Sequence, residues 1–253
     1  MPNKIVDRNG LTNINKQGEL MTIINYIDFH HVVIEFKQTK TQRVVSFSHF
    51  QNGNVVDKFY PIFYNIGYLG NTTSCINGKE KLSYTKWCNM LQRCYTDLYP
   101  NYQHCVVCDE WLCYANFEQW FNDNYSIWGN GKMSLDKDLL YKHNKIYSPQ
   151  TCLIVDSRIN TLILDSRKIR GDTPIGVYRY EYNGNIKYEV SIKKKNKKYH
   201  FGSYDTPEEA FMIYKKEKEK YIKQVADEYK TLYSNFPQKV YDALYNYSYD
   251  IDD

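Results

Sequence analysis

Two segments of the sequence decide its fold, Ser134-Leu-Asp-Lys-Asp-Leu-Leu140 and Tyr147-Ser-Pro-Gln-Thr-Cys152. The first predicts a strand that runs into a loop and carries two aspartates at its end. The Tyr-x-Pro turn of the second returns the chain, and the apolar run 152–155 predicts another strand. Ser157 then caps a helix that extends through Leu164. The predicted order is therefore strand, loop, strand, helix.

Two helices are predicted before these segments. The apolar residues from Tyr84 to Cys94 recur at the spacing of one helix face, and Ser83 is the expected N-cap. A short strand at 106–107 follows. A second helix begins near Trp111 and is expected to end near Asn130-Gly131.

Residues 1–72 form a small β module in this interpretation, because short β-branched and aromatic runs alternate with polar turns. Asn52-Gly53 predicts a two-residue hairpin, since both central positions of a type I′ turn need a positive φ. The pair His30-His31 has no partner at a spacing typical of a metal site.

The last third of the chain predicts three strands and a helix. The strands cover 175–178, 187–192 and 198–202, joined by an Asn183-Gly184 turn and a Lys-Asn turn. Thr206 is the expected N-cap of the helix, with Pro at its first position and Glu209 as the capping-box residue. The sequence therefore predicts an α+β fold of three small modules. Their ranges are 1–72, 80–168 and 172–232, followed by an acidic, Tyr-rich tail at 233–253.

Charge and composition narrow the class of protein. The net charge is only +4, but seven Lys or Arg lie between Arg179 and His200 against two Glu. Such a concentration of basic residues is typical of a surface that follows phosphates. No apolar run is long enough for a signal peptide or a membrane span, so we expect a protein of the host-cell cytoplasm that does not enter a membrane. Seven Cys in a reducing compartment then indicate buried thiols or metal ligands.

The C-terminal module resembles the Apetala-type (ethylene-response-factor) DNA-binding domain and its phage relatives over residues 174–227. The resemblance depends on Gly176-Val-Tyr178, Lys187-Tyr-x-Val-x-Ile192 and the pattern Lys198-x-His200-x-Gly202-x-Tyr204. It implies that the three-stranded sheet enters the major groove of double-stranded DNA while the helix packs behind the sheet. The DNA-facing residues it implies here are Arg179, Tyr180, Lys187, Lys193, Lys195, Lys198 and His200. The physical alternative is a solvated basic hairpin, because strand lysines also prevent edge pairing.

The central stretch, residues 84–160, resembles phage HNH-type homing endonucleases of the ββα-metal class. The matching letters include Trp87-x-x-Met-Leu-x-Arg93-Cys94, Leu135-Asp-Lys-Asp138 and Tyr147-x-Pro-x-x-Cys152. Such enzymes need a base that activates water and a divalent ion that stabilises charge on phosphate. Two positions depart from the pattern: Lys137 replaces the active-site His, and Thr151 replaces the usual Asn. The departures argue against cleavage more than against the fold.

The resemblance supplies candidates for a nuclease site. Asp136 or Asp138 would bind Mg²⁺ or Mn²⁺, Lys137 or Arg93 would contact phosphate, and the loop residue His143 would replace the base; the candidate catalytic set also includes Asn160. Two aspartates two residues apart on a strand face the same side and can share an ion. Asp138 as a cap of the following turn is an equal alternative.

The cysteines allow a structural Zn²⁺ site with Cys94, Cys105, Cys108 and Cys152 as ligands. Cysteine also packs as a small hydrophobic residue, which is the alternative. The favoured function is double-stranded DNA binding by a phage or mobile-element protein whose nuclease-like core is of doubtful activity. The alternatives are an active metal-dependent HNH endonuclease and a non-catalytic phage inhibitor that binds a host defence complex. The sequence predicts no oligomeric state.

Overall fold

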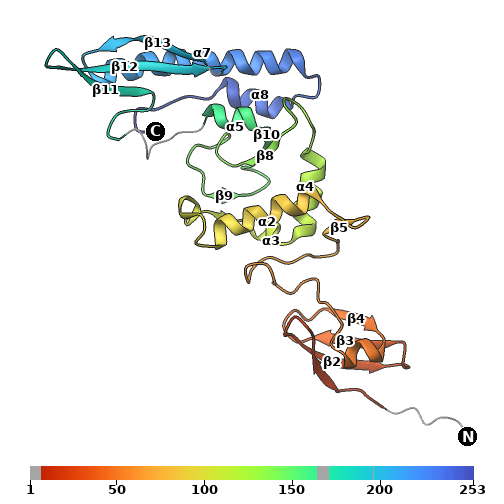
Figure 1. Cartoon of the computed structure of the whole chain (residues 1–253). Coiled ribbons are helices and arrows are strands. Elements are labelled where there is room, and N and C mark those ends of the chain that lie inside the picture. The colour runs from red at the N-terminus through yellow and green to blue at the C-terminus, as the bar shows by residue number, and fades with distance from the viewer. Residues whose placement is uncertain (1–6, 164–170, 196) are drawn as a thin grey trace, which may run out of the picture. The chain divides into compact units, whose positions relative to one another are not determined.

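The computed structural model describes residues 7–163, 171–195 and 197–253. Helices and several small sheets alternate along the chain, which confirms the α+β class (Figure 1). The chain divides into two compact units, residues 1–123 with 145–149 and residues 124–144 with 150–253. None of the helices among the described residues has the length and apolar character that crossing a bilayer requires.

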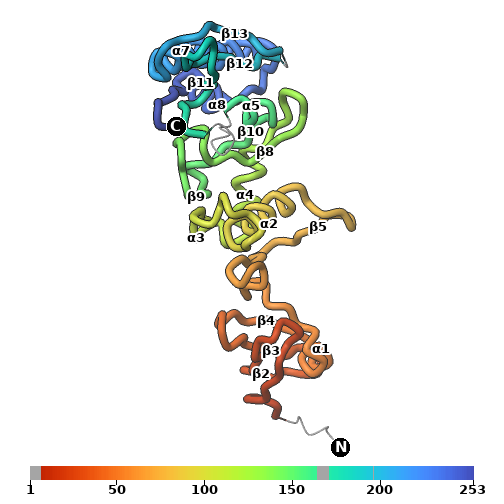
Figure 2. The backbone as a smooth tube through the Cα atoms, turned by 60° about the vertical axis from the view of Figure 1, so that its left-hand side comes forward, coloured from red at the N-terminus to blue at the C-terminus, as the bar shows by residue number. Residues whose placement is uncertain are grey.

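The first unit begins with a four-stranded antiparallel sheet. Its strands, in the order β1-β2-β3-β4, are Thr12–Ile14, Leu20–Tyr26, Val32–Phe36 and Gln42–Val45. Alternate residues of β2 and β3 point into a common core, and α1 (Phe47–Gln51) adds Phe47 and Phe50 to it. Figure 2 shows α1 beside this sheet. The short helix therefore closes the β module that the sequence predicts.

The predicted hairpin at Asn52-Gly53 is wrong. Asn52, with a φ of −85°, is the C-cap of α1, and only Gly53 has a positive φ, of +63°. The helix forms because the Ser46 hydroxyl accepts a hydrogen bond from the His49 N–H and Phe50 turns toward the core. An Asn-Gly pair that ends a helix gives the same sequence signal as one that makes a hairpin.

The rest of the first unit is mainly helical. Its elements are β5 (Cys75–Ile76), β6 (Lys79–Glu80), α2 (Leu82–Tyr95), η1 (Pro100–Tyr102), β7 (Val106–Val107), α3 (Asp109–Leu112), α4 (Tyr114–Asn124) and β9 (Ile146–Tyr147), which pairs in parallel with β7. Ser83 is not the N-cap of α2: Lys81 occupies that position, and the buried Ser83 hydroxyl lies 2.8 Å from the Tyr114 hydroxyl.

The predicted helix from Trp111 to Asn130 is also wrong in its extent. It is interrupted at Cys113, because Tyr68 inserts between the two halves. The Tyr68 N–H donates to the Leu112 carbonyl (3.0 Å), and the Tyr114 N–H donates to the Tyr68 carbonyl (2.8 Å). α4 then ends at Asn124, six residues before the expected position.

The second unit contains the predicted strand-loop-strand-helix order. β8 (Met133–Asp136) pairs antiparallel with β10 (Leu153–Asp156), and α5 (Ser157–Ile163) follows directly. Asp156 is fully buried, and its carboxylate accepts hydrogen bonds from the N–H groups of Asn130 and Arg158. The predicted extension of α5 to Leu164 lies outside the described residues.

A three-stranded antiparallel sheet and a long helix complete this unit. The strands are β11 (Val177–Tyr182), β12 (Asn185–Lys194) and β13 (Lys197–Tyr204), and α7 (Pro207–Leu232) packs on one face of the sheet (Figure 1). Asn183 and Gly184 have φ values of +50° and +76°, which confirms the predicted turn. The Thr206 hydroxyl accepts from the Glu209 N–H at 3.2 Å, which confirms the predicted cap. Asn196, in the Lys-Asn turn, lies outside the described residues.

The acidic tail is folded against α7. It forms α8 (Gln238–Tyr245), which buries Val240 and Leu244, and then an irregular segment in which Tyr249 is 2% exposed. The Lys215 ammonium, on α7, donates to the Tyr249 carbonyl at 2.6 Å. The tail therefore packs on the helix α7 of its own chain.

Candidate functional site

One face of the three-stranded sheet is turned away from α7 and carries three exposed tyrosines. Because side chains alternate along a strand, Tyr178, Tyr180 and Tyr182 of β11 share this face, with 52%, 38% and 62% of their surface exposed. The opposite face carries Val177 and its cross-strand partner Val190, which are both buried. We call the face with the tyrosines the outer sheet face.

A β-bulge brings Lys198 and His200 to the outer sheet face. Glu189 of β12 pairs with Ser203, but two residues further along β12 the partner is His200. β13 therefore has one residue more than β12 in this interval, and Gly202, with a φ of +110°, lies within it. The extra residue reverses the alternation along β13. Lys198 and His200 consequently lie on the side of Glu189 and the tyrosines.

The basic groups of the outer sheet face make exposed ion pairs. The Lys198 ammonium lies 3.4 Å from the Glu189 carboxylate and 5.3 Å from the centre of the Tyr178 ring. His200 Nδ1 lies 3.1 Å from the same carboxylate. Lys187 pairs with Asp205, whose hydrogen bond raises the pKa of Lys187. Exposed pairs of this kind are worth about 0–1 kcal/mol, so phosphate groups can replace the carboxylates.

Two of the predicted DNA contacts lie away from this face. Arg179 stands between Tyr178 and Tyr180 on β11, so its side chain emerges on the opposite face. Arg93 belongs to α2 in the first unit, where its guanidinium lies 5.6 Å from the centre of the Tyr102 ring.

Two further predicted contacts lie at the far end of β12. Lys193 pairs with Lys198 across the two strands, so its side chain shares the outer sheet face, where it also lines a pocket together with residues of α5. Lys195 follows β12 with a φ of +48°, and its ammonium pairs with Glu228 of α7 at 3.1 Å. The structure therefore brings five of the eight predicted contacts to one face: Tyr180, Lys187, Lys193, Lys198 and His200.

Asp136, the first candidate metal ligand, holds the turn after β8. Its Oδ1 accepts hydrogen bonds from the N–H groups of Asp138 (3.0 Å) and Leu139 (2.7 Å). The carboxyl group is buried. Burial raises the pKa of Asp136 above its usual value, the charge of Asp138 adds to this effect, and the Leu139 N–H opposes it. The turn is therefore capped by Asp136, whereas the sequence interpretation assigned the capping alternative to Asp138.

Lys137 and Asp138 form a closed polar cluster with Asn144. The Lys137 side chain is only 8% exposed. Its ammonium donates to both carboxylate oxygens of Asp138 (2.8 Å each) and to the Asn144 carbonyl (2.6 Å), which matches the three donors of a lysine. The Asn144 side-chain amide donates back to the Lys137 carbonyl (2.9 Å). The oxygens of Asp136 and Asp138 therefore accept hydrogen bonds from different donors.

His143 makes a contact with the end of the chain. Its Nε2 lies 3.1 Å from Asp253 Oδ1, and the neighbouring Lys142 ammonium pairs with the other oxygen of the same carboxylate. Burial opposes ionisation of Asp253, but Lys142, the Asp250 N–H and His143 together lower its pKa. His143, the candidate base, therefore contacts the C-terminal tail through Asp253. Asn160 lies half-buried on α5.

Four of the seven cysteines are buried, Cys88 and Cys108 are half-buried, and Cys75 is exposed. No disulfide joins any of the seven, all of which the structure describes. Cys94, Cys105 and Cys152 are buried, and burial raises the pKa of the half-buried Cys108, which opposes the thiolate that zinc requires. Within residues 7–163, 171–195 and 197–253, no group of three or more His, Cys, Asp or Glu is placed to hold a metal ion. The zinc and magnesium sites stay predictions without an assembled ligand set.

Sequence reasoning missed Tyr178 and Tyr182 as members of the surface. The signal was present, because both stand two residues from Tyr180 on the same predicted strand. No protein-family model, curated protein or solved structure matches this chain.

Proposed function

We propose that this chain binds double-stranded DNA through the outer sheet face. The observation that carries the proposal is the row of three exposed tyrosines on β11 beside Lys187 and Lys198. A sheet of this width fits the major groove, where lysines contact phosphates and rings contact base edges and sugars. The helix α7, which packs on the opposite face of the sheet, supports this surface.

The expected electrostatics follow from the two lysines. If Lys187 and Lys198 neutralise two phosphates, the logarithm of the binding constant falls with the logarithm of salt concentration with a slope of about −1.8. Affinity then drops about tenfold between roughly 50 and 200 mM salt. Lys198→Gln should reduce the magnitude of the slope by about 0.9.

Fluorescence anisotropy with a labelled duplex tests this proposal. Tyr182→Ala should weaken binding about fivefold, because the ring is exposed and its contact is worth about 1 kcal/mol. Lys216→Gln, an exposed lysine on α7, is the matched control and should leave both the slope and the affinity unchanged. Tighter binding to a single strand than to the duplex, or equal effects of Lys198→Gln and Lys216→Gln, would overturn the proposal.

The proposal does not extend to cleavage. Asp136 caps a turn, Lys137 and Asp138 bind each other, and His143 contacts Asp253. These contacts support a structural role for the nuclease-like segment. Incubation of supercoiled plasmid with the protein and Mg²⁺ or Mn²⁺ should give retardation without nicking. Nicking that disappears in Asp136→Asn would favour the endonuclease alternative.

A further inference from the structure

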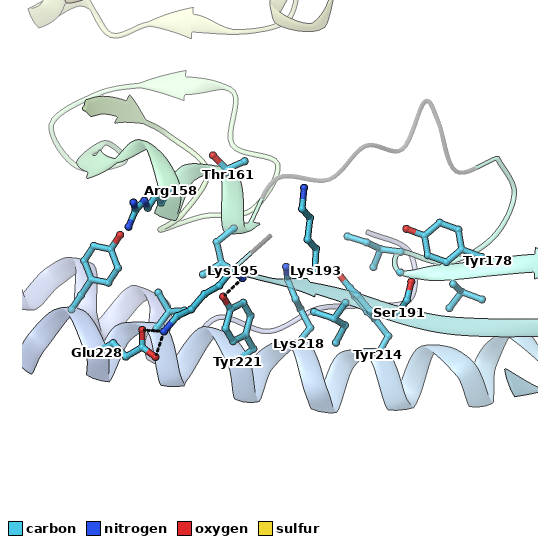
Figure 3. Close-up of a pocket in the computed structure, with 17 residues that line it drawn as sticks. Arg158, Thr161, Tyr178, Ser191, Lys193, Lys195, Tyr214, Lys218, Tyr221 and Glu228 are labelled. Atoms are coloured by element: carbon cyan, nitrogen blue, oxygen red, sulfur yellow. Dashed lines mark hydrogen bonds and ion pairs between the residues drawn. The ribbon is translucent and has the colours of Figure 1, made fainter. Parts of the chain in front are cut away.

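A pocket opens between α5, the end of β12 and α7, next to the end of the tyrosine row at which Tyr178 lies (Figure 3). Its volume is about 800 Å³, within the range of about 300–1,000 Å³ of small-molecule sites. Leu162, Ile175 and Val225 form apolar parts of its wall, and Tyr178 stands at its rim. All of its lining residues belong to the second unit. A cavity of this size holds more than a single inorganic ion.

The pocket is strongly basic. Among the described residues, its lining contains four cations, Arg158, Lys193, Lys195 and Lys218, against one carboxylate, Glu228, which leaves a formal charge of 4 − 1 = +3. Glu228 is already paired with Lys195 at 3.1 Å. For Lys193 and Lys218, no carboxylate or hydrogen-bond acceptor is found in the part of the chain that the structure describes. The charge of the pocket is therefore largely uncompensated.

Lys218 stands at a position where an apolar residue is expected. It lies four residues after Tyr214 and three before Tyr221 on α7, which places it on the helix stripe that packs under the sheet. In Figure 3 its side chain and that of Lys193 extend in the same direction, to the side on which α5 lies. Burial lowers the pKa of Lys218 to about 8. An anion that binds beside the ammonium would offset this cost of burial.

We propose that this pocket binds a nucleoside phosphate, with the phosphate at Lys218, Lys193 and Arg158 and the nucleoside against Tyr178 and the apolar wall. Guanidinium and ammonium groups together are the usual partners of a phosphomonoester, which carries more charge than a diester. Free nucleotides and the 5′-phosphorylated end of a nucleic acid present this same chemistry. The inference does not depend on DNA binding by the outer sheet face.

Isothermal titration of the full chain with adenosine 5′-monophosphate, adenosine and inorganic phosphate tests the proposal. The monophosphate should bind and adenosine should not, since the phosphate supplies the charge. Inorganic phosphate should bind at least about tenfold more weakly than the monophosphate, because it leaves the apolar wall uncovered. Absence of monophosphate binding at millimolar concentration, or equal affinity for inorganic phosphate, overturns the proposed ligand.

A matched pair of variants locates the site. Lys218→Met should lower the affinity for the monophosphate at least about tenfold, because a charge-assisted contact is lost. The apolar methionine suits the buried stripe, so thermal unfolding should occur at the wild-type temperature or above. Lys216→Met makes the same change at an exposed position two residues away and should have no effect on binding. Arg158→Gln should weaken binding as Lys218→Met does. Equal effects of Lys218→Met and Lys216→Met contradict the assignment.

Two oligonucleotides separate the sources of the phosphate. A 5′-phosphorylated strand that binds more tightly than its 5′-hydroxyl counterpart, with the difference abolished by Lys218→Met, identifies a nucleic-acid end as the ligand. Equal binding of the two strands, with tight binding of the free monophosphate, identifies a free nucleotide. Lys198→Gln should not change monophosphate binding, and Lys218→Met should not change the salt slope for duplex DNA. Failure of one proposal is therefore distinguishable from failure of the other.

Discussion

Replacing Asp136 by alanine should destabilise the second unit by about 2–4 kcal/mol. The carboxylate accepts hydrogen bonds from two N–H groups, of which that of Leu139 is buried and that of Asp138 is half-buried. A buried donor without its acceptor costs about 1–3 kcal/mol, and a half-buried donor costs less because water can reach it. The turn also positions Lys137, whose ammonium donates a hydrogen bond to the Asn144 carbonyl in the same loop. Disturbing the turn should weaken this hydrogen bond and lower the stability further.

Urea unfolding followed by circular dichroism measures this loss. Asp172→Ala removes an exposed carboxylate from the same unit and should change the free energy of unfolding by less than about 0.5 kcal/mol. Asp136→Asn keeps an oxygen acceptor for both N–H groups and should cost about 1 kcal/mol at most. If Asp136→Ala unfolds within about 0.5 kcal/mol of wild type, Asp136 does not cap the turn and the structural account of this loop is refuted.

The pH dependence of the free energy of unfolding, compared between Asp136→Asn and the wild-type protein, gives an independent check. Burial, with the charge of Asp138, raises the pKa of Asp136 above its ordinary value of 3.8. A carboxyl group whose pKa is higher in the folded state loses stability as pH rises from that ordinary value through the raised one. Asparagine has no proton to lose. Asp136→Asn should therefore compare more favourably with wild type at pH 7 than at pH 3, and the opposite trend would show that the pKa is lowered.

Two further predictions concern other parts of the second unit. Asp253→Asn should lower the free energy of unfolding by about 1 kcal/mol at pH 7, because Lys142 and His143 lose a charged partner. Since the pKa of Asp253 is lowered in the folded state, the difference from wild type in urea unfolding should shrink as the pH falls below 3.8, the ordinary pKa of this group. A constant difference down to pH 2 would contradict the contact. Gly129→Ala should lower the free energy of unfolding by about 2–4 kcal/mol, because φ is +66° and the added carbon would meet the buried Asp156 carboxylate. The control Gly171→Ala, at a φ of +70° with open space around it, should lower it by only about 1 kcal/mol. Equal losses of stability in thermal unfolding would show that the Asp156 contact is unimportant.

The sequence predicts well those elements whose signals are local. The turn at Asn183-Gly184, the cap at Thr206 and the order of β8, the loop, β10 and α5 all follow from residues that are neighbours in the chain. The break at Cys113 could not be predicted this way, because Tyr68, about 45 residues earlier, makes the hydrogen bonds that cause it. Asn52-Gly53 shows a different limit, since the same pair ends a helix or closes a hairpin.

The candidate surface was predictable only in part for a related reason. Alternation from Lys198 through Tyr204 predicts one face for Lys198, His200 and Tyr204 alike. The bulge at Gly202 separates them, so that Tyr204 pairs with Tyr188 on the helix side while Lys198 and His200 join the tyrosines. A bulge depends on the pairing of two strands, and a single strand's pattern does not reveal which glycine makes it.

Two lysines, the buried Lys137 and the half-buried Lys218, distinguish a motif from a site in this protein. Lys137 stands where the resemblance to HNH nucleases places the catalytic base, yet its three donors are bound by Asp138 and Asn144, so it has no proton or charge to offer a substrate without the loop opening. Lys218 belongs to no motif. It is a cation on an apolar helix stripe, beside Lys193 and Arg158, with no acceptor among the described residues. A half-buried charge without a partner among the described residues costs stability, and binding of a ligand of opposite charge offsets that cost. On this reasoning the better candidate for small-ligand chemistry is the pocket at Lys218, and the side chains of the loop from Asp136 to Asn144 stabilise the loop itself.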